Sequence, residues 1–308
     1  MKRQHKAVLA AFLAFGLLAT ACGGDDDDDA SGGTKSGTTI KIGVQDFGES
    51  KILSEIYKQS LEDQGFKVET TNLGGFRDLL FKAFDSGDVN LAADYLASEL
   101  EFLNGQKGEA TSDADETLGK LEPLLKDDDL HAFDVSDAVN TNAFVMTKDK
   151  ADELGIETLS DLAAKGKDLK LGAPADCEEN AFCIPGLKSK YDLDLSGKFT
   201  PLDSGVVATS LENDAIDVGV MFSTDGQIEA KDFVLLEDDK NMLAADNVFP
   251  VSTTKVADEY GDDLASILND ISAALTTEQL TEMNKAFDVD KEDAEDIAAD
   301  WLKDHPVG

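Results

Sequence analysis

From residue 39 onward, apolar residues recur along the chain with the periods of strands and helices in turn. Residues 40–44 carry apolar side chains at every second position, which predicts a strand. Residues 52–61 carry them three or four positions apart, which predicts a helix that ends near Gly65. The same periods predict strands at 66–70, 89–93, 143–147, 169–173 and 216–221, and helices at 76–84, at 206–213 and from Ser160. This alternation favours an α/β fold with mostly parallel sheets.

The last third of the chain is predicted to be helical. Residues 264–275 form one amphipathic stripe, and Thr276 with Gln279 has the spacing of a capping box that opens the next helix. A further helix is expected to start at Asp290 and to carry Trp301. In open α/β sheets, ligands bind outside the carboxyl ends of the strands. The candidate binding loops are therefore the polar segments that follow predicted strands, at 45–49, 72–75, 94–98 and 223–226.

The N-terminal segment has the pattern of an export signal. A basic start is followed by an apolar run at 7–18, which is too short to span a bilayer. Small residues then precede Cys22, which resembles a bacterial lipobox, with plain secretory cleavage nearby as the alternative. We therefore expect a signal peptide at 1–21 and a lipid on Cys22. The acidic, Gly/Ser-rich residues 22–38 cannot bury enough apolar surface to order themselves, so they predict a flexible tether.

The charge of the chain excludes some classes of partner, and its cysteines predict a disulfide. The chain has 64 acidic and 27 basic residues and a net charge of −37. Such a surface repels nucleic acid and anionic lipid headgroups. With Cys22 lipidated, Cys177 and Cys183 remain as an even pair in an oxidising compartment, and we expect them to form a disulfide.

The sequence contains few signs of catalysis or metal binding. It has no Gly-x-Ser-x-Gly elbow, phosphate-binding loop or zinc-ligand cluster. Residues 192–197 match the start of an EF-hand loop, but Asp203 stands where such a loop has its bidentate glutamate. We therefore expect no enzyme activity, no cofactor and no metal site.

Several short segments, taken together and in order, resemble one known family. They are IKIGVQDF at 40–47, NLGG at 72–75, DYLAS at 94–98, PGLK at 185–188, FSTDG at 222–226, VLLEDDK at 234–240 and LTTEQL at 275–280. The chain is similar over 39–303 to the osmoprotectant-type (glycine betaine, carnitine, choline) substrate-binding proteins of ABC importers. This resemblance implies a type II periplasmic-binding-protein fold with two lobes, two crossovers and a ligand cleft between the lobes. One lobe would hold 39–141 and 224–308, and the other 142–223.

The resemblance also implies which residues contact the ligand. Family members surround a quaternary ammonium group with aromatic rings, because the ring faces attract cations. Tyr95 and Phe222 stand at two such positions. Asn142 and Ala208 stand at the other two, so only half of the cage is expected. Gln45 and Ser98 would bind a ligand carboxylate, and Thr224 would lie near the crossover. Phe47 is expected to pack on the following helix, and Arg77 to lie on the surface.

These residues imply a zwitterionic or quaternary-ammonium ligand such as glycine betaine, carnitine or choline, and a polar extension on it would suit Asn142. The protein would be a monomer, held outside the cytoplasm by its lipid, and would deliver the ligand to an ABC permease and its ATPase. One alternative is the same fold with another amino-acid-derived solute, such as a histidine betaine. The other is an exported hydrolase or a calcium-dependent surface protein.

Overall fold

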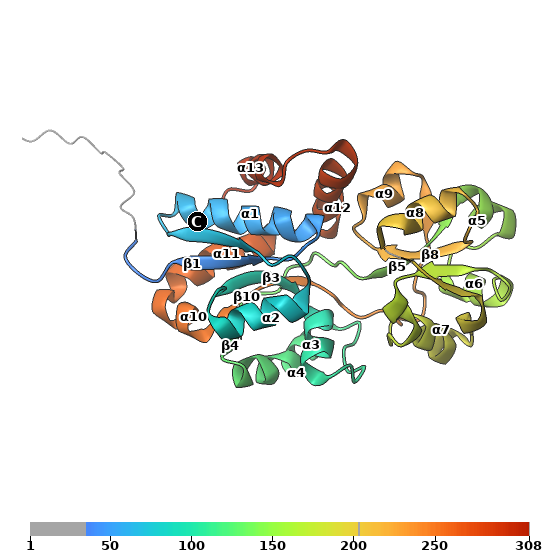
Figure 1. Ribbon diagram of the computed structural model, residues 1–308, viewed down its shortest axis with the longest axis horizontal. Coiled ribbons are helices and arrows are strands. Elements are labelled where there is room, and N and C mark those ends of the chain that lie inside the picture. The colour runs from blue at the N-terminus through green and yellow to red at the C-terminus, as the bar shows by residue number, and fades with distance from the viewer. Residues whose placement is uncertain (1–34, 203, 308) are drawn as a thin grey trace, which may run out of the picture. The chain divides into compact units, whose positions relative to one another are not determined.

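The computed structural model describes residues 35–202 and 204–307 (Figure 1). The expected signal peptide, the lipidated Cys22 and most of the tether lie outside these residues, as does Asp203. Residues 33–308 form one compact unit. It contains two five-stranded sheets, each with helices around it, which we call the first and the second lobe. Within the described residues, no helix is long and apolar enough to cross a membrane.

The first lobe is built on a sheet with the strand order β2-β1-β3-β10-β4. Its strands are β1 (Ile40–Val44), β2 (Val68–Asn72), β3 (Leu91–Tyr95), β4 (Leu130–Ala132) and β10 (Val248–Thr253). Its helices are α1 (Gly48–Asp63), α2 (Arg77–Ser86), α3 (Leu96–Asn104), α4 (Ala114–Asp127), α10 (Thr254–Tyr260), α11 (Asp262–Ala274), α12 (Thr277–Lys285) and α13 (Ala294–Asp304), with a π-helical turn at Ala286–Asp290.

Helices cover both faces of this sheet because its central strands are buried and largely apolar on both sides. In β3, Leu91 and Ala93 belong to the core that includes α1, α11 and α13, whereas Ala92 belongs to the core that includes α2, α3 and α4. The two-residue period of the strand thus sends neighbouring side chains into different cores. The polar ends of β1 and β3 are left at the edge of these layers, where a ligand can reach them.

The second lobe has the strand order β7-β6-β8-β5-β9. Its strands are β5 (Asn142–Thr147), β6 (Leu171–Ala173), β7 (Phe199–Pro201), β8 (Val218–Phe222) and β9 (Phe233–Leu235). Its helices are α5 (Lys148–Leu154), α6 (Leu159–Lys165), α7 (Ile184–Tyr191), α8 (Ser204–Glu212) and α9 (Gly226–Ala230), with 3₁₀ turns at Ala175–Glu178 and Ser196–Lys198. Two cores again lie on opposite faces, with Phe144 in one and Val145 in the other.

Two segments connect the lobes, and the second one starts later than predicted. β9 pairs with β5, so the second lobe extends to Leu235 and the chain returns through residues 236–247, not at 224. The two connections pair with one another through a bridge between Val139 and Asn247. Helix α9 packs on α12 of the first lobe, and a Cβ on Gly226 would lie 2.4 Å from Lys285 Cα. The sequence resemblance missed this arrangement because α9 touches both lobes.

The prediction of mostly parallel sheets is wrong for half of the strand pairs. In each sheet the strand that follows a crossover, β5 or β10, is antiparallel to both of its neighbours. A strand entered from the other lobe has no βαβ connection to its neighbours, so the parallel direction is not imposed on it.

Two predicted helix starts and the predicted end of the tether can be compared with the structure. The capping box is confirmed, because Thr276 Oγ1 accepts from Gln279 N and Gln279 Oε1 accepts from Thr276 N. The last helix starts at Ala294 instead of Asp290, because Lys291 has a left-handed backbone conformation that a helix cannot contain. The tether was expected to reach residue 38, but Thr38 Oγ1 donates to Glu259 Oε2 at 2.6 Å.

Candidate functional site

A cavity of about 330 Å³ lies where β1, β3 and β8 end. Two of the four predicted binding loops, 45–49 and 94–98, supply part of its wall, and the other two each adjoin a lining residue, Phe76 or Phe222. The lining residues are Gln45, Asp46, Phe47, Phe76, Arg77, Tyr95, Ser98, Asn140, Phe222 and Asp246. The cavity therefore occupies the position that the strand order of an α/β sheet predicts for a ligand.

Four aromatic side chains line this cavity. The rings of Phe47 and Phe76 stack with their centroids 6.3 Å apart, and Phe47 also lies 6.1 Å from the ring of Tyr95. Phe76 and Phe222 are 61% and 51% exposed, which is unusual for large apolar residues. Exposed rings around a cavity leave apolar faces available to a ligand, so this wall suits a ligand with a cationic or apolar head.

The structure corrects the expectations for Phe47 and for the missing half of the cage. For Phe47, packing on the next helix was favoured over a place in the cleft, but its ring lines the cavity. Ala208 was taken as a cage position, yet it is buried in the core beside Val207 and Leu211. Phe76 was not predicted as a site residue, because it follows a loop and lies inside an apolar helical pattern.

Gln45 is buried in the cavity wall with its amide donor unused. Its backbone N–H donates to Ser50 Oγ at 3.0 Å, which fixes the turn after β1. Within residues 35–202 and 204–307, its Nε2 has no hydrogen-bond partner. A buried donor without a partner costs free energy, so this group is suited to an acceptor atom on a ligand.

A second, polar compartment of about 200 Å³ adjoins the aromatic one. The two share Arg77, Ser98, Asn140, Phe222 and Asp246. The additional lining residues are Ala97, Glu101, Phe102, Gln106, Thr141, Asn142, Asp176, Asn180, Phe182 and Ala244. Of the predicted contacts, Asn142 therefore lines only this compartment, while Ser98 and Phe222 line both.

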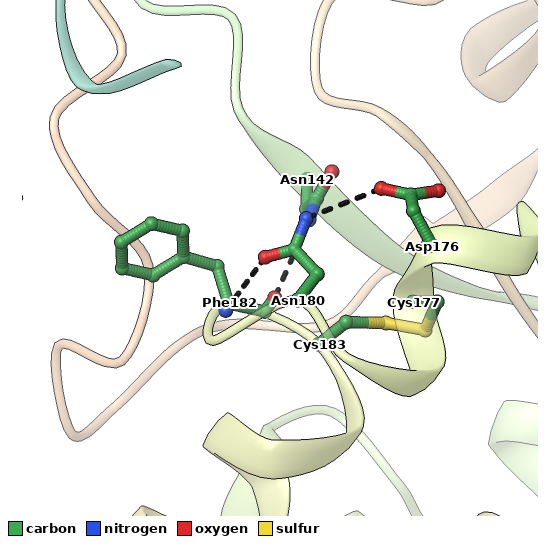
Figure 2. Close-up of a disulfide and its surroundings, with 6 residues drawn as sticks. All are labelled: Asn142, Asp176, Cys177, Asn180, Phe182 and Cys183. Carbon is green, nitrogen blue, oxygen red and sulfur yellow. Dashed lines mark hydrogen bonds between the residues drawn. A yellow bond between two sulfur atoms is a disulfide. The ribbon is translucent and has the colours of Figure 1, made fainter. Parts of the chain in front are cut away.

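A disulfide closes the loop that forms part of the polar compartment. Cys177 and Cys183 are bonded, and Asn142 Nδ2 donates to Phe182 O at 3.3 Å (Figure 2). The backbone N–H of Phe182 donates in turn to Asn180 Oδ1 at 2.8 Å. The loop is thus held at its base by the disulfide and at its tip by hydrogen bonds. Asn180 within this loop and Asp176 directly before it line the compartment.

The Glu49 carboxylate lies behind the cavity and receives four hydrogen bonds. The donors are Tyr95 Oη at 2.6 Å, Asn140 Nδ2 at 2.9 Å, Thr224 Oγ1 at 2.7 Å and Asn284 Nδ2 at 2.5 Å. They come from β3, from the first connection between the lobes, from the segment after β8 and from α12. Burial and the Glu49 charge raise the pKa of Tyr95 well above its usual value, so its hydroxyl stays a donor.

This cluster corrects the role expected for Thr224. Its side chain is 1% exposed and donates to Glu49, and it is not among the residues that line the two compartments. Tyr95 does line the aromatic compartment, but its hydroxyl is used by Glu49 and only its ring is available to a ligand.

Arg77 is not the surface residue that we expected. It starts α2, lines both compartments and donates from Nε to Asp94 Oδ1 and Oδ2 at 3.1 and 3.0 Å, and also from Nη2 to Oδ1. Asp94 is completely buried in β3, and a buried carboxylate requires a nearby cation or several donors. Burial and the Asp94 charge raise the pKa of the neighbouring Glu99 well above its usual value.

Asp246 is an acidic group that lines both compartments, and sequence reasoning missed it. Its oxygens accept from Ser98 N at 2.9 Å and from Ser98 Oγ at 2.5 Å, so Ser98, predicted to bind ligand, also holds Asp246. Burial raises the pKa of Asp246 to about 6, although the Ser98 hydrogen bonds and the Arg77 charge lower it. The residue lies on the second connection between the lobes, where the apolar pattern predicts neither a helix nor a strand.

The described residues contain no group of three or more His, Cys, Asp or Glu side chains arranged to hold a metal ion. In the segment that resembles an EF-hand start, the Asp194 carboxylate instead accepts from Lys188 Nζ at 2.6 Å.

The chain is similar to known binding proteins of transport systems. The 27% identical carnitine transport binding protein OpuCC of Listeria monocytogenes serotype 1/2a (strain 10403S) aligns over 276 residues, 88% of each chain. A glycine-betaine-binding protein of Pseudomonas aeruginosa is 28% identical over 286 residues, covering 89% of this chain and 90% of the relative.

A solved structure described as a glycine betaine/carnitine/choline ABC transporter superposes with a TM-score of 0.76 at 26% identity. The match covers 88% of this chain and 98% of the solved one. Such neighbours have the type II periplasmic-binding-protein fold, as predicted from the sequence. The family model described as the substrate binding domain of the ABC-type glycine betaine transport system matches residues 38–304. The chain therefore belongs to the family of substrate-binding domains of ABC-type glycine betaine transport systems.

Proposed function

We propose that this protein binds a small solute with a quaternary ammonium group in the aromatic compartment and delivers it to an ABC permease and its ATPase. The observation that carries the proposal is the set of four rings, Phe47, Phe76, Tyr95 and Phe222, around one cavity. The family consists of transport proteins and not of enzymes. A hydrolytic function is therefore not proposed.

The rings suit a methylated cation for a physical reason. A quaternary ammonium group cannot donate an N–H bond, so it is recognised by charge and by apolar contact. Each aromatic face attracts a desolvated cation by about 0.5 to 2 kcal/mol. Three rings come from the first lobe and Phe222 from the second. A ligand that touches both lobes favours the arrangement in which the lobes close around it.

The remaining cavity groups would orient the rest of the solute. Gln45 Nε2 is a free donor in the aromatic compartment, and Asn142 lines the polar one, which has room for an extension on the ligand. Ser98 is part of both walls. Glu49 and Thr224 lie behind the cavity and would support Tyr95 and Asn140 instead of touching the solute.

The family functions outside the cytoplasm. We further propose that the protein is a monomer, that a lipid on Cys22 holds it at the membrane, and that the acidic segment 22–34 lets it reach its permease. The supporting observation is the small-residue pattern before Cys22 together with the polar composition of the segment after it.

A melting-temperature screen of residues 33–308 tests the binding proposal. This range is one compact unit with its own cores, so it can be studied alone. The panel is glycine betaine, carnitine, choline, ergothioneine and proline. A ligand at a hundred times its Kd adds about 2.7 kcal/mol of stability, which raises melting by several degrees. No shift with any quaternary ammonium compound would contradict the proposal.

A matched pair of variants ties the shift to the aromatic wall. Phe76→Ala removes an exposed ring from the cavity, whereas Leu235→Ala removes an exposed apolar side chain from β9, outside both compartments. We expect Phe76→Ala to weaken binding about three- to thirtyfold. Leu235→Ala should leave the affinity unchanged.

A further inference from the structure

Two oxygen acceptors in the cleft have capacity that the protein does not use. Asn140 Oδ1 has no hydrogen-bond partner within the described part of the chain, and the residue is 9% exposed. Asp246 is also 9% exposed, and its two carboxylate oxygens each accept one bond from Ser98. A carboxylate can accept about four hydrogen bonds, so each oxygen has room for another donor. Both residues line the aromatic and the polar compartments.

The negative charge of Asp246 is also poorly balanced. Arg77 lines the same walls, but its Nε and Nη2 are both donated to Asp94. Burial and the Asp94 charge raise the pKa of Glu99 beside them. Arg77 with Asp94 and Asp246 therefore leaves one net negative charge in this group. Asp246, which carries this charge, lines both compartments.

We propose that the ligand carries, besides its quaternary ammonium group, a hydroxyl or another hydrogen-bond donor that donates to the Asp246 carboxylate, beside the free acceptor Asn140 Oδ1. This inference rests on the proposed function, since it places the ammonium group among the rings. Gln45 Nε2 supplies a donor to the same cavity. A hydroxyl has one donor and two acceptor sites, so it can donate to Asp246 and accept from Gln45 Nε2 at once.

The same groups discriminate against glycine betaine. That molecule has no O–H or N–H, and its carboxylate would enter a cleft that already holds the Asp246 charge. When the ligand expels water, Asp246 and Asn140 Oδ1 would lose donors and gain none. A site built to bond a ligand hydroxyl rejects analogues without it more strongly than an apolar pocket rejects a misfit. Asp246 is thus a specificity-determining residue.

Calorimetric titration of residues 33–308 with matched ligands tests this inference. Choline is compared with its O-methyl ether, and carnitine with O-methylcarnitine, because each ether keeps the cation and loses only the donor. We expect each hydroxyl compound to bind at least about tenfold tighter than its ether. We also expect choline to bind at least about tenfold tighter than glycine betaine.

Two variants test whether Asp246 causes the preference for a ligand hydroxyl. Asp246→Asn keeps an oxygen for Ser98 N but replaces the other acceptor with a donor, so the choline-to-ether ratio should fall toward one. Asp258→Asn removes an equal charge from the exposed surface of α10 and should keep the wild-type ratio.

The outcomes separate this inference from the proposed function. If choline and its ether bind equally well, or glycine betaine binds best, the donor requirement is wrong while quaternary ammonium binding stands. A ratio that persists in Asp246→Asn would overturn the assignment to Asp246. If none of these compounds binds, the proposed function fails and the inference fails with it. The ligand comparison uses the wild-type protein, so it remains decisive even if the variant does not fold.

Discussion

At the scale of single residues, Glu49 shows how the site is held in place without a local cation. Each of its oxygens accepts two bonds from neutral side chains, which belong to four separate parts of the chain. The carboxylate also lies in the first turn of α1, where the helix dipole favours a negative charge. Tyr95 and Asn140 are thereby fixed in the cavity wall from behind.

We expect Glu49→Gln to destabilise the protein by about 2 to 4 kcal/mol. A glutamine has one acceptor oxygen and brings an N–H₂ group toward side chains that are already donors, so buried donors lose their partner. Urea denaturation measures the change. Glu62→Gln, an exposed position on the same helix, should change the unfolding free energy by less than about 0.5 kcal/mol. Equal effects at both positions would show that Glu49 is not a centre of the cluster.

Asp246 should make the protein less stable as the pH rises, whereas most acidic residues make a protein less stable as the pH falls. Its folded-state pKa is about 6, above the ordinary value near 4. The folded protein therefore holds this proton more tightly than the unfolded chain, and stability is lost as pH rises through 6. The titratable groups around it are Arg77, Asp94, Tyr95 and Glu99.

Asp246→Asn removes this penalty while it weakens ligand binding. In the absence of ligand, we expect the variant to be more stable than the wild type by about 2 kcal/mol at pH 8, with a smaller difference at pH 5. Thermal melts at the two pH values measure it. A variant less stable at pH 8 would mean that Asp246 serves the fold more than the ligand.

At the scale of elements, the disulfide-closed loop is a wall of the polar compartment built from few residues. The bond between Cys177 and Cys183 closes a ring of seven residues that includes Asn180 and Phe182, and Asp176 directly precedes it. Such a ring has little core of its own. Its position therefore depends on the disulfide and on the hydrogen bond from Asn142 (Figure 2).

Replacing both cysteines by alanine should affect binding as well as stability. The chain-entropy relation gives a loss of about 2 kcal/mol for a ring of this length. We also expect weaker binding of ligands that reach the polar compartment, because Asp176 and Asn180 would be less well placed. Calorimetric titration with carnitine measures the second effect. An unchanged carnitine affinity would show that the loop does not contribute to the site.

The strands and the binding loops could be predicted because they depend on local patterns. Alternating apolar residues predicted β1, and the polar residue after it, Gln45, lies in the cavity wall. Phe76 could not be predicted as a site residue, since an aromatic residue at a helix start normally packs inward. Asp246 reaches the cavity from a connection between the lobes. Its position depends on contacts far apart in the sequence.

At the scale of the whole molecule, the two connections allow a ligand to act on both lobes. Asn140 lies on the first connection and Asp246 on the second, and both line the cavity. A solute bound between them therefore contacts the segments that must bend when the lobes move. The net charge of −37 would also raise the local concentration of a cationic solute at low salt.

The proposed lipid anchor predicts where the protein is found in the cell. Cys22→Ala should move it from the membrane fraction to the soluble fraction, because the lipid would be its only attachment. Fractionation with immunoblotting measures the distribution, and labelling with a fatty-acid analogue should mark only the wild type. Wild-type protein found mainly in the soluble fraction would contradict the anchor.

The central claim is that four aromatic rings bind a quaternary ammonium cation. The most direct test is calorimetric titration of residues 33–308 with choline and with 3,3-dimethyl-1-butanol, which has the same shape with carbon in place of the charged nitrogen. We predict that choline binds at least about tenfold tighter than the neutral analogue, because each ring attracts the cation and not its isostere. Equal binding of the two compounds, or no binding of either, would contradict the account.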